Sequence, residues 1–213
     1  MKLVFLVGLI LFGLNLNISL HAQARDPAEL KKWDHSISLN FYLFEDPFTF
    51  IPIYEVNKGH LHLGARYNYE DHKTFSGWIG YNFMGGDDLT YVLTPMVGGL
   101  VGQTNAFAVG GIVQLDFRKF SFYSESEYVF DVLANSSDYF SDYFYTWTDI
   151  SYSLADWLSM GMSVQKTRIY EPDADIQRGL LVRATTKVVD VTGYFYSPLT
   201  KEPFFVLTLS KDF

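Results

Sequence analysis

Residues 59–73 read GHLHLGARYNYEDHK, and along this stretch apolar and polar side chains alternate. One face carries Leu61, Leu63, Ala65, Tyr67 and Tyr69, and the other carries His60, His62, Gly64, Arg66, Asn68 and Glu70. Successive side chains of a strand point to opposite faces of a sheet, so the alternation predicts a β-strand with one apolar and one polar face.

The same period of two recurs in segments of about ten residues, separated by Gly, Asp, Asn, Pro and Lys, which is the pattern of transmembrane strands. We predict twelve strands, over residues 36–44, 48–56, 59–70, 74–84, 89–101, 105–117, 120–132, 141–154, 157–170, 178–186, 188–197 and 203–213. Ten is the alternative count, because the first two segments and the division near Lys187 are the least distinct. Pro95 is a local objection, since proline has no N–H to donate to a strand ladder.

The predicted connections alternate in length. Tight turns are expected near 57–58, 85–87, 118–119, 155–156 and 187, and longer polar connections near 134–138, 171–177 and 199–202. Short turns on one rim and longer loops on the other are typical of an all-β, transmembrane, antiparallel up-and-down barrel. An even strand number places both chain ends at the rim of the short turns.

Near its start the chain has Lys2, then an apolar run over 3–14 and then a small-x-small sequence at Ala22-Gln23-Ala24. This order predicts a signal peptide over residues 1–24 and one barrel domain over residues 25–213. The chain has no cysteine, so disulfides do not hold the domain together. Its net charge is −8 without basic runs, which makes nucleic acid an unexpected partner. Aromatic residues form 18% of the chain, and tyrosine and tryptophan favour membrane interfaces.

The last ten residues, FFVLTLSKDF, place Phe205, Leu207, Leu209 and Phe213 on one face. A terminal phenylalanine on an alternating final strand resembles the C-terminal signature of Gram-negative outer-membrane β-barrel proteins. The resemblance implies an outer-membrane location, contact with membrane lipid and lipopolysaccharide, and recognition of the strand ending at Phe213 by the outer-membrane assembly machinery. It brings no activity with it. A soluble exported sandwich also predicts alternation, but the terminal phenylalanine and the aromatic excess favour the barrel.

Charged and polar residues on the inward faces are the candidate functional residues. They are His60, His62, Arg66, Asn68, Glu70, Glu125, Glu127, Arg183 and Lys187. Opposite charges in a narrow barrel must pair, so an ion-pair network inside the lumen is expected. The same residues set solute selectivity if the lumen is open.

No cofactor, catalytic set or metal site is predicted. His60 and His62 share a face, but a metal needs three or four ligands. Three functions stay open. The first is a narrow pore or solute-binding barrel with a charged lumen, and the second is a structural or interaction barrel with a plugged lumen. The third is a lipid-acting enzyme at the outer rim, using Glu70, Asp71, His72 and Ser76.

Overall fold

The computed structural model describes residues 32–43, 49–131, 142–166, 176–200 and 202–213. The expected signal peptide, residues 1–24, lies outside the described residues and stays a prediction. Within the described part, no helix is long and apolar enough to cross a membrane.

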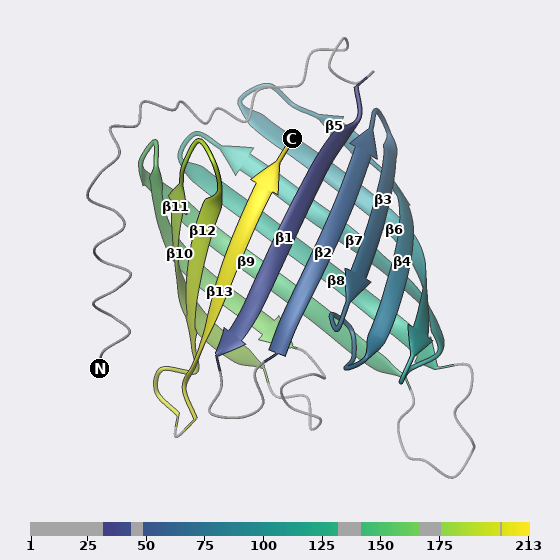
Figure 1. Cartoon of the computed structure of the whole chain (residues 1–213). Helices are drawn as coiled ribbons and strands as arrows, with labels where there is room; N and C mark the ends of the chain where they lie inside the picture. Colours follow the sequence, from purple (N-terminus) through teal and green to yellow (C-terminus); the bar gives the residue numbers. More distant parts are fainter. Residues whose placement is uncertain (1–31, 44–48, 132–141, 167–175, 201) are drawn as a thin grey trace.

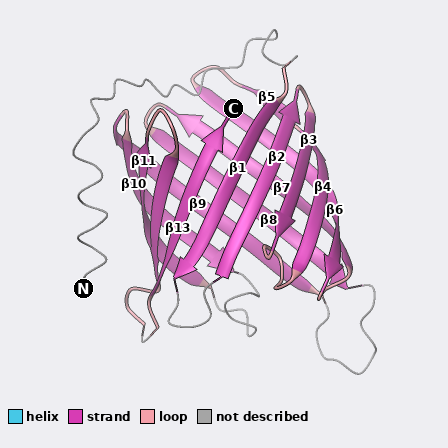
Figure 2. Cartoon of the chain, in the orientation of Figure 1, coloured by secondary structure: helices cyan, strands magenta, loops and turns pink. Residues whose placement is uncertain are grey.

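Thirteen strands occur in the described residues, and all of them belong to one antiparallel sheet (Figures 1 and 2). They are β1 (Asp34–Leu43), β2 (Thr49–Lys58), β3 (Leu61–Tyr67), β4 (Thr74–Tyr81), β5 (Phe83–Gly85), β6 (Leu89–Gly102), β7 (Ala106–Phe117), β8 (Phe120–Asp131), β9 (Tyr143–Ala155), β10 (Leu158–Lys166), β11 (Gln177–Thr185), β12 (Asp190–Tyr196) and β13 (Phe204–Asp212).

The sheet closes on itself. The first strand, β1, pairs with the last, β13, in a register that sets Leu39 opposite Leu209. At another point of the ring β4 pairs with β6, and Gly77 lies opposite Gly99. The result is a closed ring of twelve strands plus the short β5, as Figure 1 shows. The predicted all-β barrel of about twelve strands is confirmed.

The extra strand β5 continues the line of β4. Gly80 pairs with Met96 and Phe83 pairs with Leu93, so both strands keep one register against β6. In this register Tyr81, the last residue of β4, falls opposite Pro95, which has no N–H to offer the ladder. The N–H of Asn82, between β4 and β5, donates on the β3 side to the carbonyl of His60 at 2.7 Å. The proline therefore divides one long strand into two rather than ending it.

The two rims differ. The start of β1, the end of β13 and the short connections 58–61, 85–89, 117–120, 155–158 and 185–190 share one rim, here called the turn rim. The opposite end, the loop rim, carries the other connections (Figure 1). The short turns lie where the sequence predicted them. The longer connections predicted at 134–138 and 171–177 lie wholly or mostly outside the described residues.

Apolar side chains cover the outside of the ring. Ile79, Ile150 and Leu180 face outward and are about half exposed, at 52%, 46% and 56%. A belt of this kind suits a hydrocarbon surrounding. The inward positions of the same strands are buried, as Trp78 and Leu181 illustrate. The chain is thus inverted relative to a water-soluble fold, with its polar side chains inside.

One part of the face assignment is wrong. The strand predicted over 59–70 ends at Tyr67, and Asn68 has a left-handed backbone with φ 57°. Asparagine tolerates this conformation, and here its side chain accepts a bond from the N–H of Lys73 at 2.7 Å. The turn ends the strict alternation of the strand at this point. Tyr69, predicted to face lipid, is consequently inside the barrel and 5% exposed.

Two adjacent glycines of β6 give a matched test of the interior packing. A Cβ on Gly98 would lie 2.5 Å from the ring of Trp78, whereas one on Gly99 meets nothing within 4 Å. We expect Gly98→Ala to destabilise the barrel by about 1–3 kcal/mol through overpacking. Gly99→Ala is the control and should leave stability almost unchanged. Urea unfolding, followed by the gel shift between folded and unfolded barrel, measures both. Equal losses in the two variants would contradict the packing assigned to Trp78.

Candidate functional site

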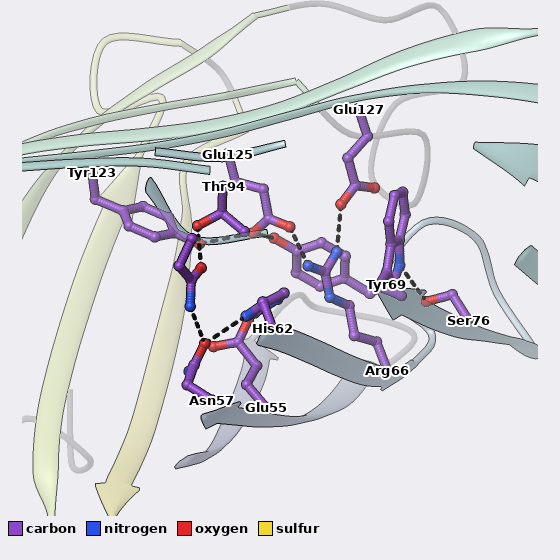
Figure 3. A network of polar contacts seen from close by, with 12 residues as sticks. Glu55, Asn57, His62, Arg66, Tyr69, Ser76, Thr94, Tyr123, Glu125 and Glu127 are labelled. Atoms are coloured by element: carbon purple, nitrogen blue, oxygen red, sulfur yellow. Dashed lines mark hydrogen bonds and ion pairs between the residues drawn. The ribbon is translucent and has the colours of Figure 1, made fainter. Parts of the chain in front are cut away.

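Four ionisable side chains meet inside the ring around Arg66, as Figure 3 shows for most of them. Arg66, on β3, donates from Nη1 to Oε1 of Glu127 on β8 at 2.5 Å. Its Nη2 forms an ion pair with Glu125, also on β8. Glu70, from the turn after β3, lies 3.5 Å from Nη1. One guanidinium therefore joins three carboxylates, two from β8 and one from the turn after β3.

Aromatic rings complete the surroundings of Arg66. The guanidinium carbon lies 4.6 Å from the ring centre of Tyr69 and 5.2 Å from that of Trp78. Both distances fall in the range of cation–π attraction, which strengthens where water is excluded. Arg66 is 1% exposed, so its charge depends on these neighbours rather than on solvent. Arg66, Tyr69, Glu70, Glu125 and Glu127 are called the Arg66 cluster below.

The cluster fixes the turn at residues 68–73 against the opposite wall. The hydroxyl of Tyr69 donates to Oε2 of Glu125 at 2.9 Å, and that of Tyr123 donates to the same atom at 2.8 Å. On the β4 side, Ser76 donates to Oε1 of Glu70 at 2.6 Å. The indole N–H of Trp78 donates to that atom at 3.0 Å. The turn is thus held from both sides.

A chain of polar side chains runs from the cluster toward the turn rim. Oδ1 of Asn57 lies 3.0 Å from Nδ1 of His62 and accepts from Asn82 at 2.9 Å. The side-chain Oδ1 of Asn82 accepts from the hydroxyl of Thr94 at 2.6 Å. Glu55 lies 4.0 Å from Nε2 of His62. Every member occupies an inward position, so the polar lining extends beyond the Arg66 cluster.

A second polar centre surrounds Asp149 on β9. Its carboxylate accepts from Ser163 at 2.5 Å, from Trp147 at 2.9 Å and from Tyr194 at 3.0 Å. Arg183 lies 3.9 Å from the same carboxylate, and its side chain is 35% exposed. This loose and partly solvated pair contrasts with the closed contacts of Arg66.

Of the nine candidate residues, Glu70 reaches the interior from the turn after β3, and three others do not occupy the predicted inward strand positions. His60 is exposed at the turn rim, where it stacks on Tyr81 at 4.9 Å, and it lies 2.7 Å from the carbonyl of Asn82. Asn68 stabilises the turn after β3, because its left-handed backbone ends the strand there. Lys187 lies exposed in the turn between β11 and β12 rather than on a strand. The alternation fails at all three positions because each belongs to a turn or borders one.

Burial of the inward side chains rises from the turn rim to the loop rim. On β8, Tyr123 is half-buried, whereas Glu125 and Val129, further toward the loop rim, are buried. On β13, Thr208 is half-buried and Phe204 is buried. Solvent therefore reaches the inner wall mainly near the turn rim, and the Arg66 cluster lies in the packed part.

The predicted inner face contains no resident metal site in the described chain. No group of three or more His, Asp or Glu side chains there could hold an ion. His60 and His62 make separate contacts, one with a main-chain carbonyl and one with Asn57. The four polar residues considered for an enzyme make contacts within their own group. Ser76 donates to Glu70, and His72 bonds Asp71 through its main-chain N–H.

No protein-family model matches the sequence, and no curated protein matches it. Solved structures do match. The KdgM porin, free and in complex with disordered oligogalacturonate, aligns with a TM-score of 0.59 at 9% identity. Both alignments cover 84% of this chain and 99% of the porin. The fold is that of outer-membrane porins. The Acinetobacter baumannii outer membrane protein Omp33 aligns with a TM-score of 0.47 at 10% identity, over 86% of this chain and 99% of its own.

The porin fold gains its interior contacts partly from residues that the sequence did not single out. Tyr123 and Asp149 already lay on inward faces by their period of two, and a search for polar partners there would find them. Trp78 and Ser76 lie on a segment whose glycines blur the alternation. Tyr69 had no such signal, because its position depends on the backbone of Asn68.

The ion pairs in this barrel predict that substituting two different arginines lowers its stability by very different amounts. Arg66→Met should destabilise the barrel by about 3–5 kcal/mol, because it leaves buried carboxylates without their cation. Arg183→Met is the control, and loss of its half-exposed pair should cost at most about 1 kcal/mol. Adding Glu125→Gln and Glu127→Gln to Arg66→Met should recover part of the loss. Urea titration of the refolded variants measures each effect. Equal losses for the two arginine variants would contradict the assigned pairing.

Proposed function

We propose that this protein is a narrow pore of a Gram-negative outer membrane, and that the Arg66 cluster forms its constriction. The observation that carries the proposal is that Arg66, on β3, forms ion pairs with Glu125 and Glu127, on β8, inside a closed ring. Charged side chains thereby determine the narrowest level of the lumen. Charged rings of this kind select the ions or solutes that pass through a pore.

The size of the ring supports this function. Barrels of eight strands are filled by side chains, whereas sixteen or more strands leave a water channel. A ring of twelve lies between these limits, so individual side chains decide how wide the lumen is. The polar inner lining, from Asn57 to the Arg66 cluster, suits passage of hydrophilic solutes.

The same fold in the KdgM porin supports a pore, but its solute does not transfer readily. Oligogalacturonate, named for one of those structures, is a polyanion. The inner wall of this chain carries more carboxylates than cations, which disfavours a polyanion there. We therefore propose small hydrophilic solutes rather than acidic oligosaccharides.

The outer surface supports the proposed location. Phe213 is 64% exposed, and the alternation of β13 places it outward with Phe205. It stacks on His35 at 5.6 Å, and main-chain bonds of 2.9 and 3.0 Å join the two residues. We propose that the apolar belt contacts membrane lipid and lipopolysaccharide, and that the assembly machinery recognises this final strand.

A plugged structural barrel is the second candidate. The observation that favours it is the packing of the inward side chains toward the loop rim, where Glu70 and Tyr196 have no exposed surface. A barrel that is filled in this way at all times would anchor partners or shape the membrane rather than conduct.

Conductance across planar bilayers separates the two candidates. We expect small unitary steps from the wild type and several-fold larger steps from Arg66→Ser/Glu127→Ser, which shortens both bridging side chains without changing net charge. Arg183→Ser/Asp190→Ser is the matched control, because it removes one charge of each sign near the turn rim. Its steps should stay close to those of the wild type. The gel shift of the folded barrel verifies that each variant is intact. Silent membranes for all three proteins at every voltage would refute the pore and leave the plugged barrel.

A further inference from the structure

We propose that the lumen attracts cations and excludes anions, an inference that rests on the proposed pore for its role in passage. The evidence is the imbalance of charge on the inner wall of the described chain. Its carboxylates include Glu55, Glu70, Asp71, Asp116, Glu125, Glu127, Asp149 and Asp190. Its arginines are Arg66 and Arg183. A pore lined in this way favours cationic solutes over anionic ones.

The lysines lie elsewhere, which preserves the imbalance. Lys58 lies 4.7 Å from the ring centre of Trp33, and Lys166 lies 6.0 Å from that of the outward-facing Phe144. Lys119 lies in a short turn, 5.9 Å from the ring of Tyr152. In the described strands and turns, these lysines are placed on the outer surface or at the rims. They cannot neutralise the carboxylates inside.

The Arg66 cluster itself carries more negative than positive groups. One guanidinium contacts three carboxylates, and Oε2 of Glu70 and Oε2 of Glu127 are buried without a hydrogen-bond partner. Both side chains are at least nine-tenths buried. A buried carboxylate oxygen without a donor favours the approach of a positive charge.

Carboxylates also outnumber cations at the inward positions near the turn rim. Glu55, Asp116 and Asp190 occupy inward, half-buried positions there. Arg183 is the cation at an inward strand position near them, while Lys119 and Lys187 lie in the turns of the same rim. Gln114, which shares their side of β7 with Asp116, is exposed to solvent although it points inward. Walls of low dielectric concentrate the field of such charges in the space between them. A solute entering from this rim therefore meets a negative potential before it reaches the Arg66 cluster.

A thiol at position 114 can measure this potential without any conduction, since the natural chain has no cysteine. The folded Gln114→Cys variant is reacted with two methanethiosulfonates, one carrying a trimethylammonium group and one carrying a sulfonate. Thr200→Cys, exposed at the loop rim, provides the reference. Each uncompensated carboxylate at about 10 Å should change the ratio of the two rates by about fourfold. We therefore expect the cationic reagent to be favoured at least tenfold more at position 114 than at position 200.

Variants that remove carboxylates provide the control for the rate ratio. Adding Glu55→Gln and Asp116→Asn to Gln114→Cys should lower the rate ratio several-fold, whereas Asp156→Asn, in an exposed turn, should change it little. A ratio at position 114 no higher than at position 200 would overturn the proposal. Conductance measurements in planar bilayers then test the attraction of cations and the pore separately. Conductance with equal K⁺ and Cl⁻ permeability would refute cation preference and keep the pore. Silent bilayers with a raised rate ratio would refute the pore and keep the attraction of cations.

Discussion

The hydrogen bonding of the main chain is the constraint on which this structure depends. In hydrocarbon an unpaired N–H or C=O finds no water, so a spanning sheet has to close. Closure is achieved by β1 with β13 and by β4 with β6. Once the ring is closed, alternate side chains point either outward to lipid or inward to the interior of the barrel. Arg66 follows from this, because an inward arginine in a packed ring requires carboxylates within its reach.

The sequence predicted the ring well because lipid-facing positions and interior positions differ strongly in the side chains that they accept. A period of two, repeated in most segments, predicted the strand number, the short turns and the common rim of the first and last strand ends. Pro95 was the main objection, and its effect turned out to be local. The register on both sides of it is the same, so the loss of one donor interrupts the ladder without shifting it. Alternation is a property of whole segments, and a single proline cannot reverse it.

The candidate site was harder to predict because it depends on a turn. The side chain that follows β3 was assigned by extending the period of two, which assumes an extended backbone. Asn68 departs from that conformation, so Tyr69 and Glu70 enter the interior together. No pattern in one sequence shows which strand of a ring lies opposite another. The pairing of Arg66 with Glu125 and Glu127 therefore needed the three-dimensional structure, although each residue was already a candidate.

The attachment of the cluster determines which of its parts can move. Glu125 and Glu127 belong to β8, whose main chain is paired on both sides with β7 and β9. Tyr69 and Glu70 belong to a turn outside the strand ladders, and side-chain bonds hold them in place. Main-chain bonds hold this turn at its ends, from Asn68 to Thr74 and from Gln103 to Lys73, whereas a full ladder holds β8 on each side. The side chains of Tyr69 and Glu70 are therefore fixed mainly by the cluster itself. The ion pairs of Arg66 link this turn to the wall, so the cluster and the turn support each other.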